Sequence, residues 1–175
     1  GQRQRWDRAS NRTSRIATLA RTDKRAAKLF GTGGQTAGSY GTGATGVAPF
    51  RRRLLRAQAV HVIAPGGSER ARSRQLQCAS PQTCGKIHGV FLPLLSIQQW
   101  LAIWQPTEAA ERDNFTAAWR NIRDELTPLQ PTQRWKRVRG PIGACVAVLA
   151  ELAWTPMQPA PWKAASGQIA GITGE

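Results

Sequence analysis

The chain has 175 residues, enough for one domain with a hydrophobic core or for a piece of a larger protein, and its first residue, Gly1 rather than Met, favours a fragment or a processed product. Its 25 Lys and Arg against 10 Asp and Glu give a formal net charge of +15, so we expect a polyanionic partner, because clustered cations gain affinity by releasing counterions from phosphates. No apolar run approaches the roughly 18 residues of a membrane span, so no membrane partner is expected, and three cysteines without a secretory signal predict a reduced intracellular setting.

The positive charge is concentrated in the first half of the chain. Residues 1–75 hold 16 Lys and Arg against three acids and carry a net charge of +13, whereas residues 76–175 carry only +2. The first half is therefore the candidate binding surface. The alternative is a solvated or disordered basic arm with no specific partner.

The basic half, residues 1–63, is expected to be a helix, a loop and a second helix. Helical spacing of apolar residues predicts the first helix over residues 11–30, and the seven glycines of residues 31–48 predict a loop, in which residues 41–46 are expected to be a flexible joint between the two helices. Pro49 suits the first turn of the second helix, over residues 49–62. Its inward face is expected to carry Phe50, Leu54, Ala57 and His61.

The second half contains the expected core. Residues 64–89 read as a polar linker, and residues 90–154 as a Trp-rich block of helices. The first of these helices is predicted between Pro93 and Pro106. The next begins with Thr107 as its N-cap and is ended by Pro128 and Pro131, and the last covers residues 142–153. Residues 155–175 are expected to be an extended or disordered tail. The predicted class is mainly α, a small helical bundle with long Gly/Pro-rich loops and a basic N-terminal half.

The hexapeptide from Gly41 to Gly46, GTGATG, has the spacing of a dinucleotide-binding loop. Such a loop needs an apolar strand before it and an acidic residue about 20 residues later, and neither is present. We therefore expect no nucleotide cofactor, and no small-molecule enzyme built on this loop.

Catalytic and metal sites also lack the required residues. Five residues separate Cys78 from Cys84, whereas structural zinc sites favour two to four, so neither this pair nor the nearby His88 is expected to bind metal. The chain has two histidines, no G-x-S-x-G motif and no Asp-Asp pair, so neither nucleophilic nor two-metal catalysis is expected of it.

Tryptophans between cations are candidates for stacking on nucleic-acid bases. Trp100, Trp104 and Trp119 have the spacing of a buried helical stripe, so burial is the expected role for them. Trp6 and Trp135, each flanked by cations, are the stacking candidates.

Two sets of short motifs stand out along the chain. The first half contains Lys28-Leu-Phe-Gly-Thr-Gly33, Gly38-Ser-Tyr-Gly41 and Gly46-Val-Ala-Pro49, followed by the arginines from Arg51 to Arg56. The second half contains Trp100-Leu-Ala-Ile-Trp104, Ala118-Trp119-Arg120, Trp135-Lys-Arg-Val-Arg-Gly-Pro-Ile-Gly143 and the stretch from Leu149 to Pro156. This series of motifs resembles the region downstream of the polymerase core in LINE-like (non-LTR) reverse transcriptases of the dinoflagellate and protist type. It covers roughly residues 20–162, but the catalytic aspartate box of the palm and the acids of a ribonuclease H domain are absent.

The resemblance implies a non-catalytic thumb or connector segment that grips the backbone of a template-primer duplex, within a larger polypeptide that would be an RNA-directed DNA polymerase. Its partner would be RNA or an RNA–DNA duplex, and its location intracellular, either nuclear or ribonucleoprotein-associated. The backbone contacts are assigned to the cations of the two basic helices, namely Arg21, Lys24, Arg25, Lys28, Arg51, Arg52, Arg53 and Arg56. The alternative is a basic, RNA-binding structural subunit of a ribonucleoprotein, such as an organellar ribosomal protein.

Overall fold

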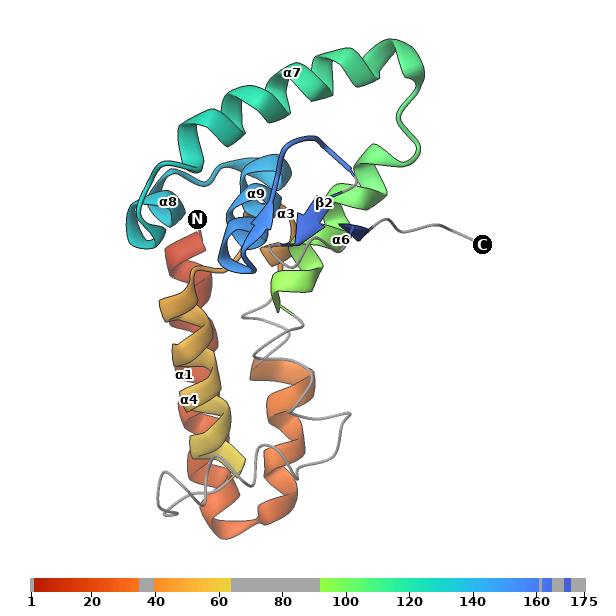
Figure 1. Cartoon of the computed structure of the whole chain (residues 1–175). Helices are drawn as coiled ribbons and strands as arrows, with labels where there is room; N and C mark the ends of the chain where they lie inside the picture. The colour runs from red at the N-terminus through yellow and green to blue at the C-terminus, as the bar shows by residue number, and fades with distance from the viewer. Residues whose placement is uncertain (1, 35–39, 64–91, 161, 165–168, 171–175) are drawn as a thin grey trace. The chain divides into compact units, whose positions relative to one another are not determined.

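The computed structural model describes residues 2–34, 40–63, 92–160, 162–164 and 169–170, and most of these residues are helical (Figure 1). The expected class, mainly α with a small helical bundle, is confirmed. The chain divides into two compact units, one formed by Gly1–Tyr40 with Pro49–Leu92 and the other by Gly41–Ala48 with Pro93–Glu175. The predicted linker, with Cys78, Cys84 and His88, lies outside the described residues.

Two helices that run in the same direction dominate the first unit (Figure 1). α1 (Gln2–Thr22) packs along α4 (Pro49–Ile63). Arg51 lies over Trp6, and further along both helices Gln58 donates a hydrogen bond to Ser10, so the pair is parallel. Buried residues recur along α1 at spacings of three and four, the pattern of a helix–helix seam: Trp6, Ala9, Thr13, Ile16 and Ala20.

Two short helices complete the core of this unit. A 3-10 helix, η1 (Lys24–Ala27), and a π-helix, η2 (Phe30–Gly34), follow α1, and Phe30 is buried against α1 and α4 residues. Asp23 begins η1 by accepting a hydrogen bond from the backbone N–H of Arg25 at 2.9 Å. The guanidinium of Arg25, and then its N–H, hold the pKa of Asp23 below its usual value.

The first unit differs from prediction in its helix boundaries and in one helix face. α1 begins at Gln2 rather than at residue 11, and it ends at Thr22 because Asp23 takes an extended conformation. The inward face predicted for α4 is wrong: Phe50 and Leu54 are 57% and 44% exposed, and the helix packs through Leu55, Ala59 and Val62. Both sets recur at helical spacing, so periodicity alone could not choose between them.

Four helices build most of the second unit: α6 (Leu92–Trp104), α7 (Ala109–Leu126), α8 (Pro131–Arg137) and α9 (Gly140–Glu151). Every residue of α9 from Gly143 to Leu149 is buried, which makes this helix the centre of the core. The ring of Trp100 lies 5.2 Å from that of Trp119 and 5.9 Å from that of Trp104. Burial is confirmed for Trp100 and Trp119, while Trp104 is half-buried.

A proline-rich segment after α9 is anchored to this aromatic cluster by its backbone carbonyls. The carbonyls of residues 156–159 accept hydrogen bonds of 2.9–3.0 Å from Trp119, Arg123, Trp162 and Trp100, in that order. Three short strands flank the segment and form an antiparallel sheet in the order β1-β2-β3: β1 (Trp154–Thr155), β2 (Trp162–Ala164) and β3 (Ile169–Ala170).

The part of the predicted tail that the structure describes over residues 155–160 and at 162 is therefore not loose. Pro156 and Pro159 are buried, and the ring of Trp162 stacks 6.4 Å from that of Trp119. Proline has no N–H with which to join a regular ladder, and the carbonyls of this segment are satisfied by side-chain donors from the helices and from β2.

The glycine-rich residues 41–48 belong to the second unit, and the predicted flexible joint is wrong here. Gly41 and Gly46, with φ of 74° and 67°, bracket α3 (Thr42–Thr45), a single helical turn that packs against α9. A Cβ placed on Gly46 would lie 2.6 Å from Cζ3 of Trp135, so this glycine is also required by close packing. Gly41 and Gly46 therefore supply the positive φ angles of a packed turn, and Gly46 also leaves room for the Trp135 ring.

The remaining differences concern helix ends in the second unit. Thr107, predicted as an N-cap, instead donates to the carbonyl of Ile103 at 2.7 Å, and the N-cap is Glu108, so α7 begins one residue later than predicted, at Ala109. α8 was not predicted, because Pro131 was taken to end a helix rather than to occupy the first turn of one. Within the described segments, no helix combines the length and the hydrophobicity needed to cross a membrane.

Candidate nucleic-acid interface

A row of arginines lies on one side of α1. Arg5, Arg8, Arg12 and Arg15 are exposed and follow one another at spacings of three, four and three residues. Each precedes a buried residue of the seam by one position, so the row runs alongside the contact with α4. It extends over about 15 Å of the helix axis. We call these four residues the arginine stripe.

No acid among the described residues is placed to neutralise the stripe. Asp7, the acid within α1, is not three or four residues from any of the four stripe arginines, and those are the spacings that bring side chains together on a helix. Among the residues that the structure describes, Arg8, Arg12 and Arg15 form no ion pair. The charge of the stripe is therefore exposed to solvent and to ligands.

The cations predicted from the sequence fall into two groups on either side of the stripe. The arginines of α4 lie near the start of α1, as the contact between Arg51 and Trp6 shows. The second group lies at the other end of α1, where Arg21 is about 22 Å from Trp6 along the helix axis. It consists of Arg21, Lys24, Arg25 and Lys28, and all four are exposed. Arg25 is partly neutralised by Asp23, with which it forms an ion pair at 3.2 Å.

Within the α4 group, the four arginines have different surroundings. Arg51 is half-buried, and its guanidinium carbon lies 5.3 Å from the ring centroid of Trp6 and 4.9 Å from that of Phe50. Arg52 is also half-buried and has a partner within the chain. Arg53 and Arg56 are exposed, so they are the members of this group best placed to reach a phosphate.

Neither Trp6 nor Trp135, the two tryptophans predicted to stack on bases, has a ring that is available for stacking. Trp6 is only 8% exposed in the seam between α1 and α4. Trp135 is half-buried, its ring lies against Gly46, and its indole N–H donates a short hydrogen bond to Glu151. Both side chains are occupied by packing, which flanking charge in the sequence could not reveal.

Among the residues of the first unit that the structure describes, the exposed aromatic rings are Tyr40 and Phe50, at 75% and 57% exposure. A guanidinium lies over each of them: that of Arg5 is 5.8 Å from the Tyr40 centroid, and that of Arg51 is 4.9 Å from the Phe50 centroid. Neither ring was expected to contact a ligand, because Tyr40 stands in a glycine-rich stretch and Phe50 was placed in the core.

Arg134 was also missed by sequence reasoning, and its role is structural. It is buried, and its guanidinium donates to the carbonyls of Leu126, Thr127 and Leu129 at 3.0, 3.1 and 2.9 Å. The last carbonyls of a helix have no partner within it, so this cation completes the end of α7 and offsets its dipole.

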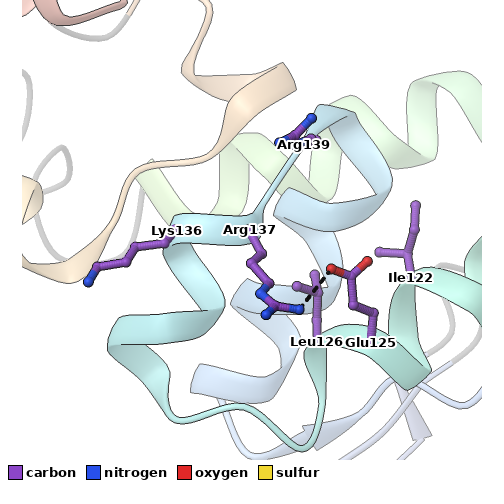
Figure 2. A pocket seen from close by; sticks show the side chains of 6 residues that line it. All are labelled: Ile122, Glu125, Leu126, Lys136, Arg137 and Arg139. Atoms are coloured by element: carbon purple, nitrogen blue, oxygen red, sulfur yellow. Dashed lines mark ion pairs between the residues drawn. The ribbon is translucent and has the colours of Figure 1, made fainter.

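The second unit has a cavity of about 520 Å³ beside α7 and α8 (Figure 2). Ile122 and Leu126 form part of its wall, and Arg137 pairs with Glu125 at 3.5 Å. The ends of Lys136 and Arg139 point away from that ion pair in Figure 2, so the cations around the cavity do not converge on one point. Across the described ranges, no three His, Cys, Asp or Glu side chains are grouped to hold a metal ion.

Comparison of the chain with protein-family models, with curated proteins and with solved structures found no significant match. The fold and the surface together define a mainly α-helical, strongly basic protein whose first unit carries an arginine stripe.

Proposed function

We propose that the first unit binds the phosphate backbone of a nucleic acid, RNA or an RNA–DNA duplex, and that the chain is a non-catalytic thumb or connector segment of a LINE-like reverse transcriptase. The arginine stripe is the observation that supports backbone binding. Residues 2–63 contain 13 Lys and Arg against two Asp, and the stripe places four of those cations in one line. Contacts of this kind position a nucleic acid without reading its sequence.

The arrangement suits a polyanion better than a small ligand. Successive arginines of the stripe are about 4.5–6 Å apart along the helix axis, so each can meet a different phosphate of one backbone. Arg53 and Arg56 add exposed guanidinium groups on the neighbouring helix. Each phosphate neutralised by such a group releases counterions, and binding should therefore weaken steeply as salt is added.

The test is the affinity for a labelled mixed-sequence duplex, measured by fluorescence anisotropy over a series of salt concentrations. The double variant Arg8→Gln/Arg12→Gln should reduce the slope of log affinity against log salt by up to about 2, since each phosphate contact contributes about 0.9. The control is Arg120→Gln/Arg139→Gln, which removes the same charge from exposed positions in the second unit. An equal reduction of this slope in the control variant would mean that net charge, rather than the stripe, governs binding.

The reverse-transcriptase part of the proposal rests on the sequence resemblance and has its own test. The coding sequence upstream of Gly1 should encode a polymerase palm with its catalytic aspartates. A reading frame without a palm, together with co-sedimentation of the protein with ribosomes, would support the ribonucleoprotein subunit instead.

A further inference from the structure

Two groups of arginine and aromatic side chains lie where α1 and α4 begin. The guanidinium of Arg5 lies over the ring of Tyr40, and that of Arg51 lies over the rings of both Trp6 and Phe50. All five residues belong to the first unit. We call this group the aromatic-arginine cluster.

Two rings of the cluster have surface available to a ligand. Trp6 is buried in the helix seam, but Tyr40 and Phe50 are 75% and 57% exposed. Single exposed aromatics are common on protein surfaces and by themselves indicate nothing. Here each exposed ring has a cation on one side, and Arg5, which covers Tyr40, is also the first residue of the arginine stripe.

We propose that the aromatic-arginine cluster stacks the unpaired bases of a nucleic acid whose backbone lies along the arginine stripe, an inference that rests on the proposed function. An aromatic ring accepts any base, because every base has a π face, and a guanidinium can add to the stack from the ring's other side. The stripe holds phosphates and the cluster holds bases. The preferred ligand is therefore a duplex with a single-stranded extension.

A protein partner would use the same region differently. Phe50 and Leu54 lie on the outer face of α4, and a helix docked there would bury both side chains. Leu54 has no π face, so base stacking does not require it. The two kinds of ligand are distinguished by comparing substitutions of Leu54 and of the rings.

The experiment uses three probes with the full chain: a blunt duplex, the same duplex with a six-nucleotide extension, and that duplex with an extension of abasic nucleotides. The normal extension should bind at least about fivefold more tightly than the abasic one, since the latter keeps the phosphates but cannot stack. Tyr40→Ala and Phe50→Ala should each reduce this ratio, whereas Tyr40→Phe should preserve it. Leu54→Ala is the matched control and should leave it unchanged.

The outcomes separate this inference from the proposed function. Binding of the blunt duplex with no preference for the normal extension, or a preference unaffected by Tyr40→Ala and Phe50→Ala, would overturn base stacking while leaving backbone binding intact. A ratio lowered equally by Leu54→Ala would also overturn it, in favour of a general apolar contact. Failure to bind any of the three probes would reject the proposed function itself. Thermal melts of each variant establish that its fold is retained.

Discussion

At Gly46, both the backbone conformation and the packing of a neighbouring ring disfavour a side chain. Its φ of 67° and ψ of 177° fall in a region that is essentially restricted to glycine, and a side chain there costs about 1–3 kcal/mol. In addition, a Cβ would lie 2.6 Å from Cζ3 and 2.9 Å from Cη2 of the Trp135 ring. The ring belongs to a packed core, and overpacking of that kind costs about 1–3 kcal/mol more.

We therefore expect Gly46→Ala to lower the free energy of unfolding by about 2–6 kcal/mol, a large share of the roughly 5–15 kcal/mol typical of a domain. The assay is urea denaturation followed by tryptophan fluorescence. Gly140→Ala is the control, because Gly140 has the same φ of 67° but a Cβ there would meet nothing within 4 Å. It should show a backbone cost without the steric clash, about 1–3 kcal/mol.

A double-mutant cycle isolates the steric part. Trp135→Leu removes the ring that the new Cβ would meet, so Gly46→Ala should cost less in that background than in the wild type. Equal effects of Gly46→Ala and Gly140→Ala, with no coupling to Trp135, would refute the packing argument and restore the interpretation of residues 41–48 as a flexible joint.

Three further predictions concern the second unit. Trp119→Phe leaves the Pro156 carbonyl without its indole donor and should lower the free energy of unfolding, measured by urea denaturation, by about 2–4 kcal/mol. Trp154→Phe should lower it less, because the Trp154 indole makes no hydrogen bond within the described segments. Arg134→Met removes a cation that donates three hydrogen bonds to carbonyls and should cost about 2–4 kcal/mol, seen as a lower Tm. Burial raises the pKa of the Cys145 thiol, so the folded state resists its ionisation and stability should fall above about pH 8.5 by up to about 1.4 kcal/mol per pH unit. The Cys145→Ala variant should lack that part of the decline.

Each of these three predictions has a result that would contradict it. Equal costs for the two Trp→Phe changes would mean that the indole hydrogen bond does not anchor the proline-rich segment. An unchanged Tm for Arg134→Met would mean that water satisfies the end of α7 equally well. Parallel pH profiles for the wild type and Cys145→Ala would show that this thiol does not couple to folding.

Sequence reasoning found the strongly patterned elements and missed those whose signal is weak. α6 and α4 lie close to their predicted positions, since apolar periodicity and a first-turn proline mark them clearly. The start of α1 was missed because residues 2–10 contain few apolar side chains, and the arginine stripe was missed with it: without a helix there, Arg5 and Arg8 have no defined relation to Arg12 and Arg15.

The sequence by itself determined the helical class, the strongly basic first half and the burial of Trp100 and Trp119, because composition and period are local properties of the chain. Only the tertiary structure decided which of two apolar stripes on α4 packs inward, and that Trp6 is buried while Tyr40 and Phe50 are exposed. It also decided that residues 41–48 form a packed turn of the second unit. These outcomes depend on which residues from distant parts of the chain pack against each side chain. The local spacing of residues does not specify those tertiary contacts.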